Sequence, residues 1–573
     1  MVKRRRRSDA SIDGEAPSAL LEPVLALLPG TSLLELPAAL LDDVALRSTQ
    51  LGAGGTLSLT CGAFSKTNLL HAPALHIQLD SQRCDQQLTP RVVAALQSRT
   101  CQLALTLERQ PAQSSRQYIT LLTEVLKKLA SCAAVEACNL GSIQGPSFSF
   151  HKTLGFSPDL AQHLMGSFPS LTSLSLHNFS IPCSDLATLL SHPRLSLQLQ
   201  QLDLSSTTIL QAKRPEPRAA TLANLFHASR LKQLSLLFNN RAEGTGRPLL
   251  PNLQPLVQHL TQLCIQQREG KLWGLYEFTA ALQPLAQLQV LTLSRTPDLG
   301  GLSELLQALP RLHTLQLPGA AVYGQEQLDT LLAATQLSSI KLHSFQRLTN
   351  LRADVPCSWQ RMELTGYVDC SSAAHLPLHS LTQPLVLAAL AISANEGDNC
   401  ALVAAAVHNL TQACSVPVRI KELWLYMSEE DTAAEQHVEL QQLVAVVQAL
   451  KHCSFEKVQV SNMNVGVADV LTLAPLCQGC TQLGFAYGSV TPSLEFWRQL
   501  VQLMPTVTHL TFSYSDGSAS AAMHQSLQLM AEQPWARWLD ICIVRPSGSD
   551  RLPTCWQASP LTQPGKLRVW FKT

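Results

Sequence analysis

A hexapeptide with apolar residues at its first, fourth and sixth positions recurs along most of this chain, and leucine is its commonest residue. Side chains alternate along a β-strand with a period of two, so the fourth and sixth residues lie on one strand face. From Leu171 to Trp359, successive copies start 22 to 32 residues apart. The copies start at Leu171, Leu199, Leu231, Leu260, Leu288, Leu312, Leu337, Trp359, Ile420, Phe455, Cys480 and Val507. This recurrence predicts a series of short, equivalent strands.

Helical patterns separate the copies. We predict a helix over 184–190 with Ser184 as its N-cap, and another over 302–309, ended by Pro310. A third, longer helix would begin at Ser428 and carry apolar residues as far as Leu450. The gap of 61 residues between Trp359 and Ile420 predicts one degenerate unit near Leu385.

A strand and a helix cannot bury the leucines of one unit by themselves, but stacked units bury a continuous core. The fold class we expect is therefore α/β: a horseshoe-shaped solenoid with short parallel strands and with helices on its convex side.

The amino-acid composition excludes several classes of function. Charged residues make up only 14% of the chain and the net charge is +1, which argues against a nucleic-acid binder, since such a protein needs a basic face. The longest uncharged apolar run, residues 385–394, has about half the length of a membrane span. The 16 cysteines follow no disulfide spacing, and no signal peptide is evident. We expect a reduced, intracellular protein in the cytoplasm, the nucleus or both, because the run Lys3–Arg7 is either a nuclear import signal or a solvated tail.

The repeat resembles the leucine-rich-repeat family, in particular its irregular, ribonuclease-inhibitor-like members, over roughly residues 70 to 573. That family usually has an asparagine three residues after the last strand leucine. Among the copies compared, Asn239 fits this pattern. The other slots hold Phe179, Thr207, Arg268, Thr296, Ala320 and Met463.

Residues 33–79, ahead of the repeats, resemble an F-box. In that family a helical hairpin docks the small adaptor protein that links to a cullin scaffold. The apolar residues that match are Leu36, Pro37, Leu40, Leu41, Val44, Leu57, Leu59, Cys61 and Phe64. The match departs from the family at Ala38 and Ala39, where an acidic residue is usual. The alternative is an ordinary helical cap on the first repeat, which solenoids need.

This resemblance gives a domain organisation: a disordered basic tail over 1–30, an F-box-like helical domain over 31–75 and a leucine-rich-repeat solenoid over 76–573.

Residues beside the strand leucines are expected to line the inner face of the solenoid. They form a nearly neutral ladder of serine, threonine and glutamine, which changes character at Glu422, Trp424 and Tyr426. Exposed aromatic residues are hot-spot candidates for protein binding, although Trp424 could equally pack across strands. The predicted target-binding residues are His177, Asp203, His343, Glu422, Trp424 and Tyr426.

No catalytic residue, metal site or cofactor is predicted. Cys477 and Cys480 form a CxxC motif, but a zinc site needs four ligands and no second pair follows at the usual distance. We therefore expect a protein that is not an enzyme.

Three functions remain. The first is the substrate-recognition subunit of a cullin-type (SCF) ubiquitin ligase, with the F-box docking the adaptor and the repeats binding a target protein. The second is a non-enzymatic leucine-rich-repeat interaction scaffold with no ubiquitin role. The third, a GTPase-activating solenoid of the Ran-regulating type, ranks last, because the basic, apolar end 566–573 does not fit it.

Overall fold

The computed structural model describes part of the chain. The described residues are 74–80, 88, 90–99, 102–108, 115–143, 158–210, 226, 230–238, 252–267, 274–296, 299–346, 357–393, 398–426, 444–461, 466–477, 479–485, 493–513, 517–533, 539–544, 562–563 and 567–572.

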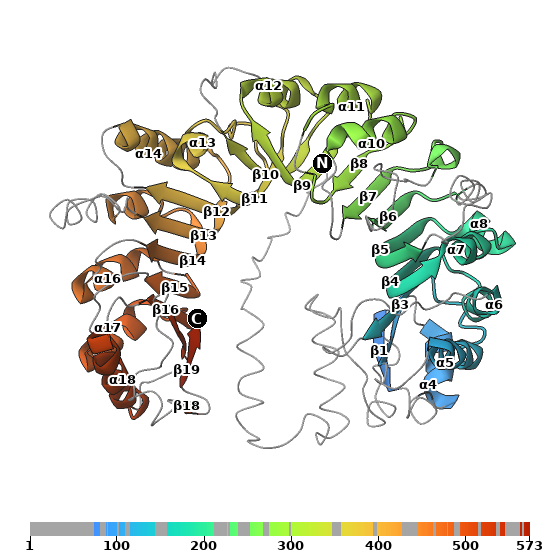
Figure 1. The fold of residues 1–573 in the computed structure, drawn as a ribbon, viewed down its shortest axis with the longest axis horizontal. Helices are drawn as coiled ribbons and strands as arrows, with labels where there is room; N and C mark the ends of the chain where they lie inside the picture. The colour runs from blue at the N-terminus through green and yellow to red at the C-terminus, as the bar shows by residue number, and fades with distance from the viewer. Residues whose placement is uncertain are drawn as a thin grey trace, which may run out of the picture. The chain divides into compact units, whose positions relative to one another are not determined.

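The chain forms two compact units. The first comprises Met1–Asn239 and Pro251–His259, and the second comprises Asn240–Leu250 and Leu260–Thr573. In each unit short strands lie side by side and helices cover one side of them (Figure 1).

The first unit alternates strands with helices. Its elements are β1 (Ala74–Asp80), α4 (Pro90–Arg99), β2 (Gln102–Glu108), α5 (Ser115–Lys128), β3 (Ala137–Ile143), α6 (Pro158–Ser167), β4 (Ser173–Pro182), α7 (Cys183–Leu190), α8 (Pro193–Gln198), β5 (Gln201–Leu210), β6 (Gln233–Phe238) and the 3-10 turn η4 (Gln254–Leu256). Each strand from β1 to β6 pairs in parallel with the next.

The second unit continues the pattern. Its elements are β7 (Gln262–Gln267), α10 (Leu275–Leu282), β8 (Val290–Leu293), α11 (Leu302–Ala308), β9 (Thr314–Tyr323), α12 (Gln325–Ala333), β10 (Ser339–Gln346), β11 (Arg361–Val368), α13 (Cys370–Ala374), β12 (Leu385–Ser393), α14 (Asp398–His408), the π-helix η5 (Asn409–Ala413), β13 (Val418–Tyr426), β14 (Ser454–Ser461), α16 (Val467–Leu473), η6 (Ala474–Cys477), β15 (Gln482–Phe485), α17 (Leu494–Leu503), β16 (His509–Ser513), α18 (Gly517–Ala531), β17 (Leu539–Val544), β18 (Thr562–Gln563) and β19 (Leu567–Lys572). From β7 to β17, each strand is parallel to the next. β17 also pairs in parallel with β19, and among the described strands only the short β18 pairs in an antiparallel way.

The repeat leucines form the core, as the spacing predicts. Leu174, Leu202 and Leu234 are paired in register on β4, β5 and β6, and each is at most 1% exposed. Burying a leucine side chain stabilises the fold by about 1.5–3 kcal/mol, and a unit gains this only when its neighbours cover it. The predicted α/β leucine-rich-repeat solenoid is therefore confirmed. The degenerate unit near Leu385 is confirmed as β12.

The repeats begin before the copy at Leu171. β1, β2 and β3 precede Leu171 and pair in parallel with one another and with β4. Their hexapeptides begin with Ala72, Thr100 and Val135. Of these three residues Thr100 breaks the apolar pattern, whereas the copies at Ala72 and Val135 fit it and are overlooked by the sequence analysis. β1 begins at Ala74, so the array includes the last two residues of the predicted helical domain.

The three helices predicted from the sequence have different outcomes in the structure. α7 forms, but its N-cap is Pro182 and makes no side-chain capping bond. The predicted cap Ser184 is wrong, since its hydroxyl donates to the neighbouring carboxylate of Asp185 (3.0 Å). α11 ends at Ala308, just before Pro310, as predicted. Of the third helix, residues 444–449 are helical, and Ser428 lies outside the described residues. In the part of the chain that the structure describes, no helix has the length and apolarity needed to cross a membrane.

Buried hydroxyl groups donate hydrogen bonds to backbone carbonyls of the preceding coil, that is, the preceding strand with the helix that follows it. Thr207, which occupies the asparagine slot and is fully buried, donates its hydroxyl hydrogen to the Leu176 carbonyl of the preceding coil (2.5 Å). Ser372 does the same toward the Phe345 carbonyl (2.6 Å). These bonds satisfy backbone acceptors between coils, which would otherwise be costly to bury.

The two buried threonines Thr207 and Thr296 provide a matched test. The hydroxyl of Thr296, also fully buried, has no hydrogen-bond partner. We expect Thr207→Val to lower the free energy of unfolding by about 1–2 kcal/mol, because it removes a donor from a buried carbonyl. Thr296→Val should leave stability unchanged or raise it, because it removes an unpaired polar atom. Denaturant unfolding of the two full-length variants measures both values, and equal losses would contradict the assignment.

Candidate functional site

The side chains that alternate with the buried strand residues lie on what we call the open face, the sheet face opposite the core. On β13, Ile420, Leu423 and Leu425 are fully buried, whereas the residues between and after them are partly exposed. Glu422, Trp424 and Tyr426 therefore share the open face. With residues of β11 and β14 they form what we call the aromatic patch. Its members are Tyr367, Glu422, Trp424, Tyr426, Lys457 and Gln459.

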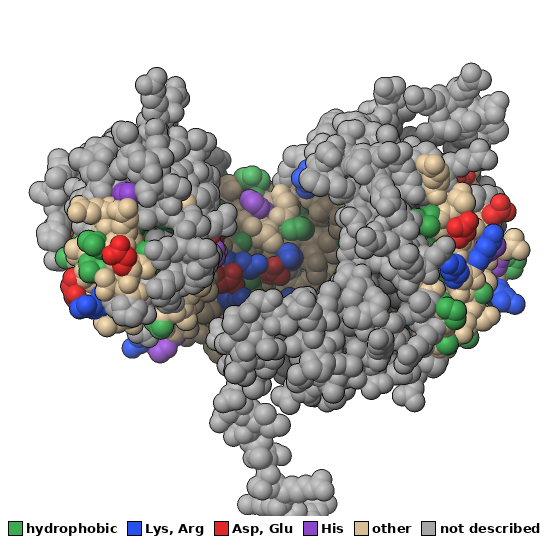
Figure 2. Space-filling model, turned by 90° about the horizontal axis from the view of Figure 1, so that it is seen from below, with side chains coloured by type: hydrophobic (Ala, Val, Ile, Leu, Met, Phe, Trp, Pro, Cys, Tyr) green, Lys and Arg blue, Asp and Glu red, His purple; other side chains and the backbone are tan. Residues whose placement is uncertain are grey.

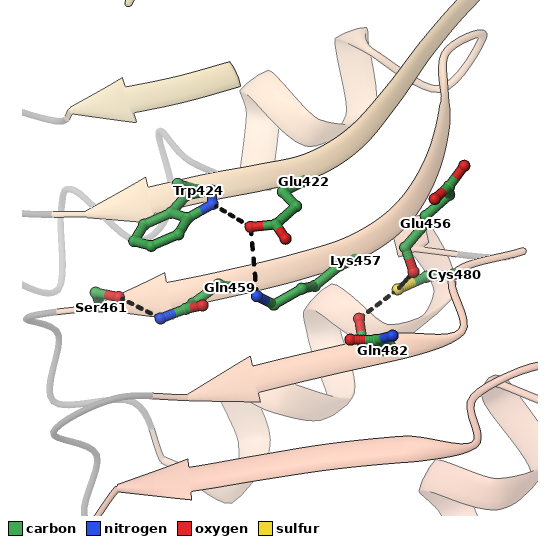
Figure 3. A network of polar contacts seen from close by, with 8 residues as sticks. All are labelled: Glu422, Trp424, Glu456, Lys457, Gln459, Ser461, Cys480 and Gln482. Atoms are coloured by element: carbon green, nitrogen blue, oxygen red, sulfur yellow. Dashed lines mark hydrogen bonds and ion pairs between the residues drawn. The ribbon is translucent and has the colours of Figure 1, made fainter. Parts of the chain in front are cut away.

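The Glu422 carboxylate organises the patch (Figure 3). Its Oε2 accepts a hydrogen bond from Trp424 Nε1 (3.0 Å) and forms an ion pair with Lys457 Nζ (3.3 Å). Lys457 Nζ also lies 5.7 Å from the centroid of the Trp424 ring, within the range of a cation–π contact. These three contacts hold the indole in one orientation and neutralise the charge beside it.

Tyr367 approaches the patch from β11, two strands away from Tyr426. Its side chain is among the exposed large hydrophobic groups, at 43%. It is paired with Ala389 of β12, while Ala391 is paired with Trp424. Ala391 is only 2% exposed, so this part of β12 is covered. Burial and a hydrogen bond with Tyr426 raise the pKa of the Tyr367 phenol above its usual value, so the hydroxyl keeps its proton at neutral pH.

Some of the charged side chains on this unit form ion pairs. Lys341 Nζ lies 2.7 Å from Glu363 Oε1, and Arg419 Nε donates to Glu456 Oε1 (2.9 Å). Partly exposed pairs of this kind add little stability. Basic and acidic side chains lie next to one another in Figure 2.

The other predicted target-binding residues belong to separate places. In the first unit, the His177 ring bonds to Ser175 Oγ through Nε2 (2.8 Å) and to Ser206 Oγ through Nδ1 (2.7 Å). Asp203 Oδ1 accepts the backbone N–H of Ser205 (2.8 Å). Both side chains are thereby fixed by their own neighbours.

His343 lies exposed on β10 in the second unit. Its ring packs so closely on Gly366 that a Cβ at that position would overlap it. An alanine at this position would require the His343 ring to move, which an exposed side chain can do.

The predicted adaptor-binding residues lie outside the described residues. They are Leu36, Pro37, Leu40, Leu41, Val44, Leu57, Leu59, Cys61 and Phe64.

The CxxC motif is part of the core. Cys477 and Cys480 are fully buried free thiols. Burial, followed by the proximity of Cys480, raises the pKa of Cys477 to about 12. The Cys480 thiol donates to the Gln482 carbonyl (2.6 Å). Protonated, enclosed thiols are poor metal ligands and nucleophiles. Within the described ranges, no group of three or more His, Cys, Asp or Glu residues is placed to hold a metal ion.

The sequence analysis missed members of the aromatic patch, including Tyr367 and Lys457. Tyr367 is on the open face because buried and exposed residues alternate along β11 from Arg361 to Val368, so simple alternation could have found it. Lys457 directly precedes a strand valine, Val458, and an alignment of the copies would have placed it beside Glu422.

No family model matches the chain. No curated protein matches it in sequence. Solved structures do match it. An internalin from Listeria monocytogenes is 16% identical with a TM-score of 0.30, and the match covers 74% of this chain and 89% of that one. The TLR13 chain of a TLR13–ssRNA13 complex is 14% identical (TM-score 0.29; 66% and 47% covered), so the match spans about half of that chain. The Toll–Spatzle complex from Drosophila is 11% identical (TM-score 0.33; 85% and 63% covered).

Proposed function

We propose that this chain is a protein-interaction module that binds a target protein through the aromatic patch and performs no chemistry itself. The observation that carries the proposal is a partly exposed tryptophan, Trp424, held in place by Glu422 and flanked by Tyr426. Preorganised aromatic side chains of this kind lose little entropy on binding and are frequent hot spots.

We further propose that the target is held for ubiquitin transfer. In this reading residues 31–75 dock the adaptor of a cullin-type SCF ligase, and the repeats act by holding the target near the loaded ubiquitin. Two sequence features support it: the apolar pattern around Leu36–Pro37 and its position directly ahead of a leucine-rich array. The basic run Lys3–Arg7 supports a nuclear as well as a cytoplasmic site of action. If docking fails, the module is an interaction scaffold without a ubiquitin role.

Adaptor binding tests the ligase proposal. We expect the full-length double variant Leu40→Asp, Leu59→Asp to bind the purified adaptor at least about tenfold more weakly than the unmodified chain, because each change places a charge in an apolar docking face. The matched control is Leu197→Asp, since Leu197 on α8 is already 60% exposed. An unmodified chain that does not bind the adaptor, or a double variant that binds as well as the control, would refute this docking role.

A further inference from the structure

We propose that the protein segment bound at the aromatic patch is acidic, and that basic side chains around the patch recognise its carboxylates. This inference rests on the proposed interaction function and names the chemistry of the partner.

Charged residues gather on the strands that carry the aromatic patch. Of the described strands from β7 to β16, only β10, β11, β13 and β14 contain Lys, Arg, Asp or Glu. All of these charged side chains are at least partly exposed, and we call them the charged belt. Its members are Lys341, Arg361, Glu363, Arg419, Lys421, Glu422, Glu456 and Lys457. The charged belt and the aromatic patch therefore share one set of strands.

The charged belt is positive. Five of its members are basic and three are acidic, which gives a net charge of +2, whereas the whole chain carries +1. A local excess of positive charge steers a partner of negative charge to this surface and fixes its position there.

The acidic members of the charged belt are already paired. Glu363 lies near two cations, Lys341 Nζ (2.7 Å) and Arg361 Nη2 (3.9 Å). Glu456 Oε1 accepts from Arg419 through Nε (2.9 Å) and through Nη2. The third carboxylate is the one that organises the aromatic patch (Figure 3). A basic partner would have to displace these contacts, so it would gain little net attraction.

The basic members retain capacity for a further anion. A lysine ammonium or an arginine guanidinium has more N–H donors than one carboxylate oxygen accepts. The Arg419 side chain is still 60% exposed beside Glu456. Lys421 is exposed and has no ion-pair partner among the residues that the structure describes. The hydrogen-bonding capacity that remains on this surface is cationic, and carboxylate oxygens complement it.

A nucleic acid complements the charged belt less well than an acidic protein segment does. A phosphate backbone is negative along its whole length, and the carboxylates of the belt lie among its basic groups. A protein segment can place its carboxylates at the cations and neutral residues elsewhere. An apolar residue between its carboxylates can contact Trp424. Mixed charge beside aromatic side chains therefore favours a protein partner.

Fluorescence anisotropy with labelled decaglutamate and the full-length chain tests the inference. We expect saturable binding that weakens at least about fivefold when NaCl rises from about 50 to about 500 mM, because salt screens exposed charges. Arg361→Glu and Lys421→Glu should each weaken binding at least about fivefold, since each change reverses one charge of the belt.

Arg498→Glu is the matched control for Arg361→Glu. The Arg498 side chain is 48% exposed and ion-paired with Glu495 (3.2 Å), much as Arg361 is 54% exposed and ion-paired with Glu363, but it lies on helix α17. The control changes the net charge of the chain by the same amount and should bind decaglutamate normally. Circular dichroism verifies that each variant is folded.

Absence of saturable binding, binding that salt does not weaken, equal losses in Arg361→Glu and Arg498→Glu, or tighter binding of labelled decalysine or of deca-thymidylate would each overturn the inference. The proposed function fails separately. If decaglutamate does not bind but capture of a protein target still depends on Trp424, only the ligand class is wrong. If target capture is also independent of Trp424, the interaction role of the patch is wrong as well.

Discussion

Trp424→Ala is expected to weaken the binding of this chain to its protein target by at least about 30-fold, or about 2 kcal/mol. The indole is partly exposed and is fixed by Glu422 and Lys457, so its truncation removes a rigid apolar contact and leaves the carboxylate without one of its two donors. Immobilised full-length chain, incubated with cell extract, measures the loss as the amount of each retained protein.

Tyr276→Ala is the control for that experiment, because it also truncates an exposed aromatic side chain but on helix α10. Proteins retained by the unmodified chain and by this control should be lost from Trp424→Ala. Retention of the same proteins by both variants would exclude the patch as the binding surface.

Gly319→Ala is expected to lower the free energy of unfolding by about 3 kcal/mol, at the upper end of what overpacking costs. A Cβ at Gly319 would lie 2.6 Å from Arg295 Cα and 2.9 Å from its backbone nitrogen. Arg295 itself has a left-handed backbone, with a φ of 61°. Neither side of this contact is a flexible side chain, so relief requires the backbone of two neighbouring coils to separate.

Gly484→Ala is the matched control for Gly319. A Cβ at Gly484 would meet Gln459 Cγ and Thr511 Cβ at 3.6 Å, which is ordinary van der Waals contact. Its free energy of unfolding should stay within about 1 kcal/mol of the original. Denaturant midpoints of the two variants give the comparison, and similar values would mean that the coils separate without cost.

The fold was predictable because its main determinant is local in sequence. Two apolar residues at a spacing of two define a strand face wherever they occur, and their recurrence implies stacking. At β2 the polar Thr100 breaks the apolar pattern, whereas β1 and β3 fit it through Ala72 and Val135 and were overlooked. The helix cap at Ser184 was wrong for a different reason: Pro182 already begins the turn, and the serine hydroxyl finds a closer partner in Asp185.

The contacts between neighbouring coils could not be predicted from the sequence. Thr207 and Thr296 occupy the same slot of the repeat, yet only the first finds a carbonyl of the preceding coil. No single-residue property distinguishes the two threonines.

The candidate site was predictable only within single strands. Alternation alone placed Glu422, Trp424 and Tyr426 on one face. Alternation along β11 could also have placed Tyr367 on the open face, but which residues of β13 Tyr367 and Lys457 meet depends on the pairing register. The register of strand pairing is set by packing over a whole coil, so no short sequence motif predicts it.

Site-specific photocrosslinking tests most directly whether the aromatic patch is where this chain holds a protein. A photoreactive amino acid would replace Tyr426 in one full-length chain and Tyr276 in another. Our account predicts a covalent product with a target protein from position 426 and none from position 276. A product formed only from the helix position would contradict it.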